Sequence, residues 1–269
     1  MSWRQIFAIV RRDLRLVARA RAVVMPLVIV PLIFFVVFPI GAVLGIRAGG
    51  EALTELQPLI AMLPAEVAAS LGPPPLERQL LVYLLEYQFA SFFLLVPLMV
   101  CAVIAADSFA GEKERKTLEA LLYTPTSDRE LYLAKLLGPW LAAIGVSLFS
   151  YVVYLVIANA LTAGDIGRPV AITPLWVLTV AWLGPAVGAM AISILVVVSA
   201  RVRGFQEAYQ LGGAIVLPVV ALVVGQLAGA LVLDARLAAV LGLIVWLIAA
   251  AILYFASRGF RRERLLRQV

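Results

Sequence analysis

Histidine is absent from the 269-residue sequence, and cysteine occurs once, at Cys101. Zinc proteases of the His-Glu-x-x-His type and hydrolases with a Ser-His-Asp triad both need histidine, so neither class fits this chain. A single cysteine cannot form an intrachain disulfide or a thiolate metal cage. These two absences exclude most of the common catalytic and metal-binding chemistry.

Charged residues are scarce, at 14% of the chain, whereas apolar residues make up 64%. A soluble domain is typically about 25% charged and about 45–50% apolar. The few charges here could not cover the surface of a water-soluble fold of this length. The composition therefore excludes an ordinary soluble domain, a disordered chain and a disulfide scaffold. It predicts a protein that crosses the membrane several times.

Six apolar stretches, drawn so that none contains a charged residue, are long enough to cross a bilayer core about 30 Å thick. They run over Val23–Ile46, Tyr87–Ala106, Leu136–Leu161, Leu175–Ala200, Tyr209–Leu233 and Ala238–Ser257. The alternation of apolar and polar residues that marks barrel strands is missing, and a helix satisfies its own backbone hydrogen bonds in lipid. We therefore expect an all-α fold in which residues 1–269 form a single domain of six transmembrane helices.

The lysines and arginines are distributed unevenly about these spans. Eighteen of the 22 fall on one side: in the N-terminal segment, in the loops after the second and fourth spans (Lys135 among them), and in a basic tail at residues 258–269. The positive-inside rule places that side, with both termini, in the cytoplasm. The net charge of +6 thus reports topology, and nucleic-acid binding is the weaker interpretation. The first apolar run is too long for a cleavable leader, so we expect a retained signal anchor.

Residues 2–20 predict a strongly amphipathic helix. Its apolar residues recur at intervals of three and four: Trp3, Ile6, Phe7, Val10, Leu14 and Val17. At about 100° per residue they share one narrow face, and the arginines occupy another. We expect this helix to lie in the cytoplasmic headgroup layer, with Trp3, Phe7, Arg11 and Arg15 at the membrane interface. Two roles stay open: an anchor for the first span, or a lever that passes motion from a cytoplasmic partner to the spans.

The longest loop on the opposite side, residues 47–86, is acidic, with Glu51, Glu55, Glu66, Glu77 and Glu86. We interpret it as a cap of short helices on the ends of the spans, with solvated carboxylates rather than a cation site. The link between the fifth and sixth spans is very short, so we expect these two spans to be antiparallel neighbours.

Small residues and prolines mark places where the spans approach closely or bend. Three glycine pairs have the small-xxx-small spacing, which favours close packing within one chain more often than between copies. They are Gly41/Gly45, Gly184/Gly188 and Gly225/Gly229. Prolines lie inside the first five spans, where each is expected to kink its helix because it lacks the backbone N–H.

The cytoplasmic loop at residues 107–131 carries the densest charge away from the termini. The spacing predicts a short helix over Glu112–Tyr123, which Pro125 stops. Ser127 and Glu130 then form a capping box that starts the helix of the third span. A plain connection between two spans needs only a few residues, so this loop is predicted to be a compact element on the membrane surface.

This loop resembles the signature of the ABC-2-type transporter permeases. It reads Glu112-Lys-Glu-Arg-Lys-Thr-Leu-Glu-Ala-Leu-Leu-Tyr-Thr-Pro-Thr-Ser, and the family pattern is roughly Glu-Lys-Glu-x-Gly-Thr-Leu-Glu-x-Leu-Leu-x-Thr-Pro-x-Ser. Lys116 departs from it, since many members have glycine there. The resemblance is specific from Asp107 to Leu131. The six-span layout and the amphipathic N-terminus extend it less specifically over the rest of the chain.

The resemblance implies one transmembrane subunit of an ATP-driven exporter in a prokaryotic plasma membrane. A second copy, or a related permease chain, would pair with it, and two separate P-loop ATPase subunits would dock below and bind ATP and Mg. The permease itself would be no enzyme and would hold no cofactor. The loop would be the coupling helix that contacts the ATPase through Glu112, Lys113, Glu114, Thr117, Leu118, Glu119, Leu122, Thr124 and Pro125.

Two other classes of function remain as alternatives. The chain has no Gly-x-x-x-x-Gly-Lys-Ser/Thr phosphate loop, so an ATP-driven function needs a separate ATPase chain. An ATP-independent carrier or channel is less favoured because the predicted spans contain no ionisable groups. An intramembrane enzyme is least favoured, since the spans offer neither an acidic pair nor a serine–lysine pair. An ATPase partner would distinguish the first class from the other two.

Overall fold

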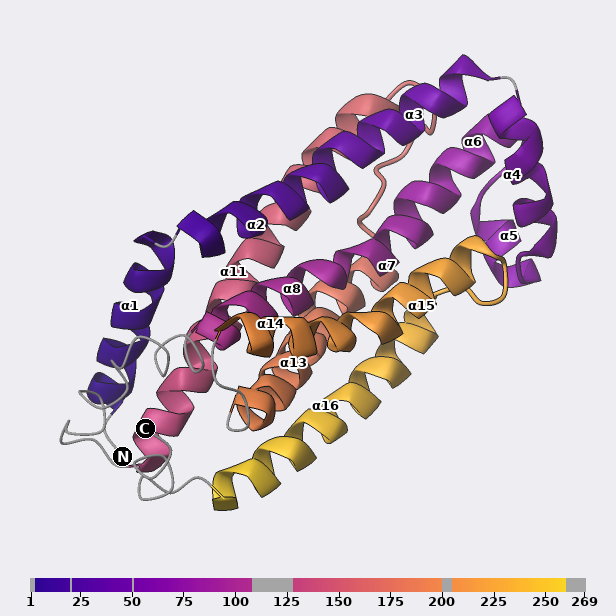
Figure 1. Cartoon of the computed structure of the whole chain (residues 1–269). Helices are drawn as coiled ribbons and strands as arrows, with labels where there is room; N and C mark the ends of the chain where they lie inside the picture. The colour runs from indigo at the N-terminus through magenta and orange to yellow at the C-terminus, as the bar shows by residue number, and fades with distance from the viewer. Residues whose placement is uncertain (1–2, 20, 50, 108–127, 200–204, 260–269) are drawn as a thin grey trace.

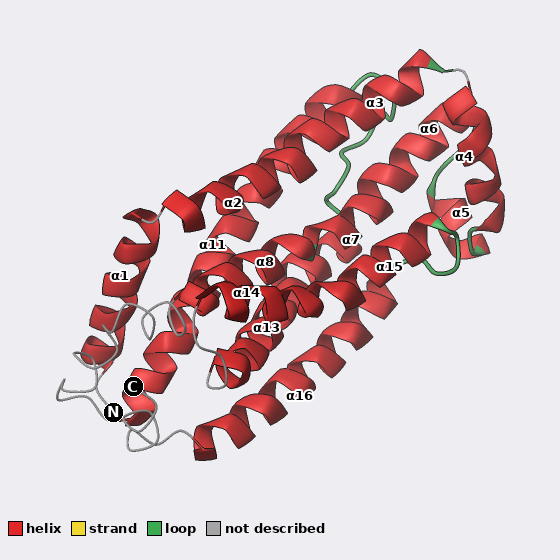
Figure 2. Ribbon diagram, in the orientation of Figure 1, coloured by secondary structure: helices red, strands yellow, loops and turns green. Residues whose placement is uncertain are grey.

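The computed structural model describes residues 3–19, 21–49, 51–107, 128–199 and 205–259. Within these ranges every element is a helix, and the predicted all-α fold is confirmed (Figure 2). Six helices are long and apolar enough to cross a membrane, as the hydropathy pattern predicts. They cover Val24–Ala48, Leu76–Ala106, Glu130–Thr162, Pro174–Val198, Gln210–Leu227 and Ala235–Ala256, and we number them spans one to six.

The spans are built from shorter helical elements, several of which join without a loop (Figure 1). The amphipathic helix α1 (Trp3–Arg19) precedes span one, and α4 (Glu51–Met62) and α5 (Ala65–Ser70) form the cap between spans one and two. Span one comprises α2 (Arg21–Leu32), η1 (Ile33–Val37) and α3 (Phe38–Ala48). Span two comprises α6 (Leu76–Val82), η2 (Tyr83–Gln88), α7 (Phe89–Phe93) and α8 (Leu95–Ala106).

The remaining spans follow the same scheme. Span three is the single helix α11 (Asp128–Thr162). Span four comprises α12 (Pro174–Leu178), η4 (Thr179–Leu183) and α13 (Gly184–Ser199). Span five comprises α14 (Phe205–Gly213), η5 (Ala214–Val216) and α15 (Leu217–Leu227), and span six is α16 (Ala235–Gly259).

Span two is the centre of the bundle. In its most apolar window 89% of the residues are buried, against 17% in spans one and six. Its helix α8 packs against α11, α13 and α14 together. A helix that is apolar on every face can be surrounded on every face, so span two forms the core while spans one and six lie at the edge. The link between the fifth and sixth spans is short, yet each of the two spans packs mainly against a different helix. α16 packs along α13, and α15 packs along α7.

Widened turns precede two of the prolines. The π-helical turns η1 and η4 end two residues before Pro39 and Pro185, respectively. A proline ring clashes with the carbonyl four residues earlier, which falls inside the preceding turn, and a wider turn relieves that clash. The predicted bends at these prolines thus take the form of local π turns within otherwise continuous spans.

Aromatic rings join the first four spans in the core. Trp176 stacks on Tyr154 with ring centroids 4.9 Å apart and on Tyr151 at 5.4 Å. Phe35 and Phe93 meet the same cluster edge-on, Phe35 to Tyr154 at 5.6 Å and Phe93 to Trp176 at 5.9 Å. Each such pair contributes about 0.5–1.5 kcal/mol beyond its buried area, so the cluster fixes spans one to four relative to one another.

The three glycine pairs have different surroundings. A Cβ added at Gly188 would lie 3.1 Å from the sulfur of Cys101, so the Gly184/Gly188 pair packs within the chain, against span two. Gly41 and Gly45 are exposed, with no neighbouring atom within 4 Å of an added Cβ. Gly229 lies beyond the end of α15 with φ of 69°, so Gly225/Gly229 is not a helix-packing pair.

Span six contains a close contact that the glycine pairs did not predict. The indole of Trp182 lies against Gly242, where an added Cβ would overlap the ring. The Trp182 Nε1 donates to the Ala239 carbonyl at 3.1 Å. A glycine at position 242 therefore lets span six approach span four closely enough for this hydrogen bond to form.

Glu86 corrects the prediction that no span contains a charge. Span two begins at Leu76, earlier than the predicted Tyr87, so Glu86 lies inside the span and is 3% exposed rather than solvated. Arg168 holds both of its carboxylate oxygens, at 2.6 and 3.1 Å. These hydrogen bonds raise the pKa of the Arg168 guanidinium above its ordinary value, so it stays charged at every physiological pH.

Three arginines fasten the loop between spans three and four, residues 163–173. Besides the Arg168 contact, Arg47 at the end of α3 pairs with Asp165 at 2.6 Å, and Arg78 of α6 donates to the Ile166 carbonyl at 2.8 Å. The loop is therefore tied to both span one and span two. Arginines on this side of the bundle serve to join its elements.

Replacing Arg168 by glutamine is expected to lower the free energy of unfolding by about 2–3 kcal/mol, because it leaves the buried carboxylate of Glu86 without a cation. The value lies below that for a fully buried pair because the Arg168 side chain is 43% exposed. Denaturant unfolding in detergent, followed by tryptophan fluorescence, measures it.

Arg236→Gln is the matched control for this prediction. Its pair with Glu66 spans 3.6 Å, with both side chains largely exposed, so little change is expected. The double variant Glu86→Gln/Arg168→Gln should recover part of the lost stability. Equal losses from Arg168→Gln and Arg236→Gln would contradict a structural role for the Glu86–Arg168 pair.

Candidate functional site

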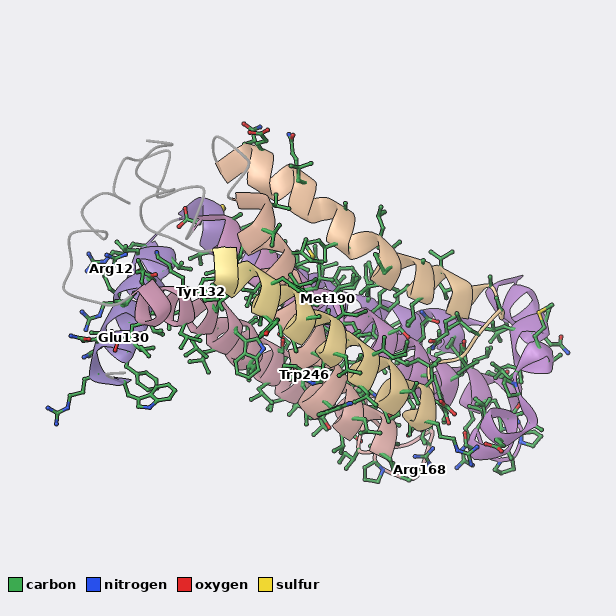
Figure 3. The ribbon with its side chains drawn as sticks, turned by 90° about the horizontal axis from the view of Figure 1, so that it is seen from below. Arg12, Glu130, Tyr132, Arg168, Met190 and Trp246 are labelled. Atoms are coloured by element: carbon green, nitrogen blue, oxygen red, sulfur yellow. The ribbon has the colours of Figure 1, made fainter. Side chains whose placement is uncertain are left out.

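The candidate site lies at the end of the bundle that carries α1, opposite the cap formed by α4 and α5 (Figure 1). Here α1 packs against the first part of α11. Ile6 and Val10 of α1 form a small core with Ala134 of α11, and Leu14 and Leu137 pack against it. We call this region the α1 end; in Figure 3, Arg12, Glu130 and Tyr132 lie there and Arg168 lies at the opposite end.

A buried ion pair crosses the contact between α1 and α11. The Lys135 Nζ lies 3.0 Å from Oδ2 of Asp13, and the two side chains are 2% and 7% exposed. The second carboxylate oxygen of Asp13 accepts from the guanidinium of Arg12 at 2.8 Å. Both oxygens of the carboxylate are thus engaged, one by a buried lysine and one by a half-exposed arginine.

Burial makes this pair sensitive to the position of α1. Moving a charge out of water costs several kcal/mol, and only close pairing with good hydrogen bonds offsets that cost. If α1 slid or rotated by one residue, Lys135 would lose the Asp13 carboxylate while remaining buried. The pair therefore holds α1 in one register on α11, which α1's apolar contacts alone would specify less strictly.

Sequence reasoning missed both members of this pair. Lys135 belongs to α11 and is buried, whereas the charge pattern placed it in a solvated loop. For Asp13 a signal exists, because Ile6, Val10, Asp13 and Val17 follow one another at helical spacing and all four are buried. A carboxylate on an apolar stripe indicates a buried cation on the facing helix.

The apolar face of α1 is divided into two parts. The stripe just described faces α11, whereas Trp3 and Phe7 are 56% and 55% exposed, with ring centroids 6.3 Å apart. Arg11 and Arg15 are also exposed. An exposed pair of aromatic rings beside arginines is typical of a helix at a membrane surface. The membrane-interface role of these four residues stays a prediction.

The predicted coupling residues, from Glu112 to Pro125, lie outside the described residues. Their flanks are described: Asp107 follows α8 and Glu130 lies in the first turn of α11, each 8% exposed. The segment between them therefore connects α8, the central helix of the bundle, to α11, the helix against which α1 packs. A helix across Glu112–Tyr123 stays a prediction.

No cluster of histidine, cysteine, aspartate and glutamate that could hold a metal ion occurs among the described residues. Cys101 is free and buried. The α1 end joins α1 to α11 through the buried ion pair, and it presents the exposed arginines of α1.

A known protein family matches most of this chain. The model of a family described as ABC-2 family transporter protein matches residues 7–242, from α1 into α16. The matched stretch includes Asp13, the segment between α8 and α11, and Lys135. No curated protein matches the chain.

Replacing Asp13 by asparagine is expected to lower the free energy of unfolding by about 3 kcal/mol, because Lys135 loses the Asp13 carboxylate while it stays buried. Arg12→Gln should cost far less, since that side chain is 42% exposed. Adding Lys135→Met to Asp13→Asn should restore most of the loss. The three variants and the double variant form a double-mutant cycle read by thermal unfolding; additive effects of the Asp13 and Lys135 substitutions would contradict the pair.

Proposed function

Because this chain belongs to the ABC-2 family of transporter proteins and is thus a permease component of an ABC transporter, we propose that it couples ATP hydrolysis in a separate subunit to export of a substrate. The observation that carries the proposal is the family match, which extends over nearly the whole described fold. The chain has no phosphate loop of its own, so a P-loop ATPase partner supplies the energy.

We place the docking surface for the ATPase in the segment between α8 and α11. Its charged sequence and the Thr-Pro that follows match the coupling signature, with Glu112, Glu119 and Pro125 at the characteristic positions. The flanking helices support this placement, because α8 is the core of the bundle and α11 continues unbroken for 35 residues. At 1.5 Å per residue a helix of that length extends about 50 Å, enough to carry a movement across the membrane.

The lever role for α1 gains support from its contact with α11. An anchor for span one would need only an apolar face toward lipid. Instead, α1 carries a buried carboxylate that pairs with Lys135 of α11. A movement of the coupling segment that displaces α11 would therefore move α1 with it, and α2 follows α1 directly in the chain.

The complete transporter in this proposal holds two permease chains, either two copies or this chain with a relative, and two ATPase subunits that bind ATP and Mg. It resides in the plasma membrane of a prokaryote, with the α1 end in the cytoplasm. The basic residues of α1 and of the segment between α8 and α11 support that orientation under the positive-inside rule.

Affinity purification of the tagged chain from its native membrane is expected to capture a P-loop ATPase. In the reconstituted complex, Glu119→Lys should lower permease-stimulated ATP hydrolysis, because it reverses a charge at the docking surface. The expected loss is about tenfold, comparable to losing one or two close ion pairs at an interface. ATP turnover in proteoliposomes is the measurement.

Glu66→Lys makes the same charge change in the cap at the opposite end, where the side chain is largely exposed, and should leave the ATPase rate unchanged. A stable complex whose ATPase activity is unaffected by Glu119→Lys would contradict the docking assignment. Transport driven by an ion gradient alone, without any captured ATPase, would favour an ATP-independent carrier instead.

A further inference from the structure

An apolar groove opens between span one and α11 near the α1 end. It has a volume of about 640 Å³ and is open on one side. Leu27 and Leu32 line it from α2, Val146 and Phe149 line it from α11, and Val17 closes its end from α1. We call it the α2–α11 groove. Phe149 is 71% exposed and Leu32 is 50% exposed, so the open side faces the surroundings of the bundle.

The shape of span one explains why the groove exists. Pro26 and Pro31 lie inside α2, and the π turn η1 follows. The π turn and α3 pack against α11, whereas α2 contacts α11 less extensively. Between α2 and α8 the remaining space is only about 10 Å³. The unfilled volume therefore lies on the α11 side, where the bent span leaves a gap that side chains do not close.

The lining of the groove fits a hydrocarbon chain and little else. Ser150 is the single polar residue among those that line it, and its hydroxyl donates to the Val146 carbonyl at 2.7 Å. No polar side chain of the lining is thus left to bind a sugar, a peptide or an ion. The volume falls within the range of about 300–1,000 Å³ that is common for small-molecule sites.

Positive charge stands at the α1 end of the groove. Leu14 and Ala18 of α1 belong to the lining, and Arg15 and Arg19 follow them directly in the helix. Both arginines are exposed, and neither pairs with an acidic residue in the described ranges. Two exposed guanidinium groups beside an apolar groove are complementary to an anionic headgroup with an acyl chain attached.

We propose that the α2–α11 groove holds one acyl chain of an anionic membrane phospholipid. The lipid phosphate lies at Arg15 and Arg19, and the acyl chain runs along Leu27 and Leu32 toward η1. The acyl chain fills the gap left by the bend in span one and supports α2 against α11. This inference goes beyond the proposed function, because it holds whether or not ATP drives the permease.

Photolabelling in defined vesicles tests the proposal. The full chain is reconstituted in phosphatidylcholine with a small amount of phosphatidylglycerol that carries a diazirine near the end of one acyl chain. Adducts are then mapped by mass spectrometry. They are expected on α2, η1 and the facing side of α11. An even spread over all lipid-facing helices would mean bulk lipid only and would overturn the proposal.

Two glycine variants form a matched pair. Gly145 lines the groove, Gly41 lies on α3 away from it, and at each an added Cβ meets no atom within 4 Å. Gly145→Leu puts a side chain into the groove and should reduce its labelling several-fold. Gly41→Leu should leave the labelling unchanged. Equal labelling of both variants, each with an unchanged unfolding temperature, would overturn the proposal.

The headgroup is tested separately. The preference for labelled phosphatidylglycerol over labelled phosphatidylcholine should fall about fivefold for each of Arg15→Gln and Arg19→Gln. Arg4→Gln, at the far end of α1, is the control. Equal labelling by the two lipids in the unmodified chain would overturn the anionic assignment. Disulfide formation between two copies carrying Phe149→Cys would assign the groove to a second permease chain instead.

Discussion

The buried ion pair between Asp13 and Lys135 is the interaction on which the α1 end of this permease depends. Each charge is costly to bury, so the pair forms only when α1 lies in one register on α11. From that contact, α11 runs without a break to the opposite side, and α2 continues from α1. The ion pair thus adds a register-specific contact to the apolar core that Ile6, Val10 and Ala134 form between α1 and α11.

A second ion pair, whose carboxylate is buried, lies at the other end of the bundle. Glu86 of span two and Arg168 of the loop after span three close that end, while the aromatic cluster around Trp176 fills the core between the two pairs. Span two is surrounded by the rest of the bundle, and span one is bent and only partly packed. The arrangement combines a fixed centre with a first span that contacts α1 at one end and, through its α3 part, α11 at the other.

Local patterns in the sequence predicted much of this fold. Hydropathy located all six spans, the helical period located α1, and the charged signature after span two identified the family that the match over residues 7–242 confirms. The missed features are those that join distant segments: Asp13 with Lys135, Glu86 with Arg168, and Trp182 over Gly242. From composition alone, a charged residue is expected to be solvated. Only the tertiary structure shows that it is buried beside a partner from a distant segment. The coupling residues stay predictions from the motif.

We expect α1 and α11 to move as one body when the transporter works. Cys101 is buried, so spin labels can be placed on engineered cysteines at the exposed positions Ala8 of α1 and Leu141 of α11. Pulsed electron paramagnetic resonance then measures the distance between them in the complex, without nucleotide and with trapped ATP. We predict one narrow distance that is the same in both states and broadens in Asp13→Asn. A distance that shifts with nucleotide while the ion pair is intact would contradict the claim.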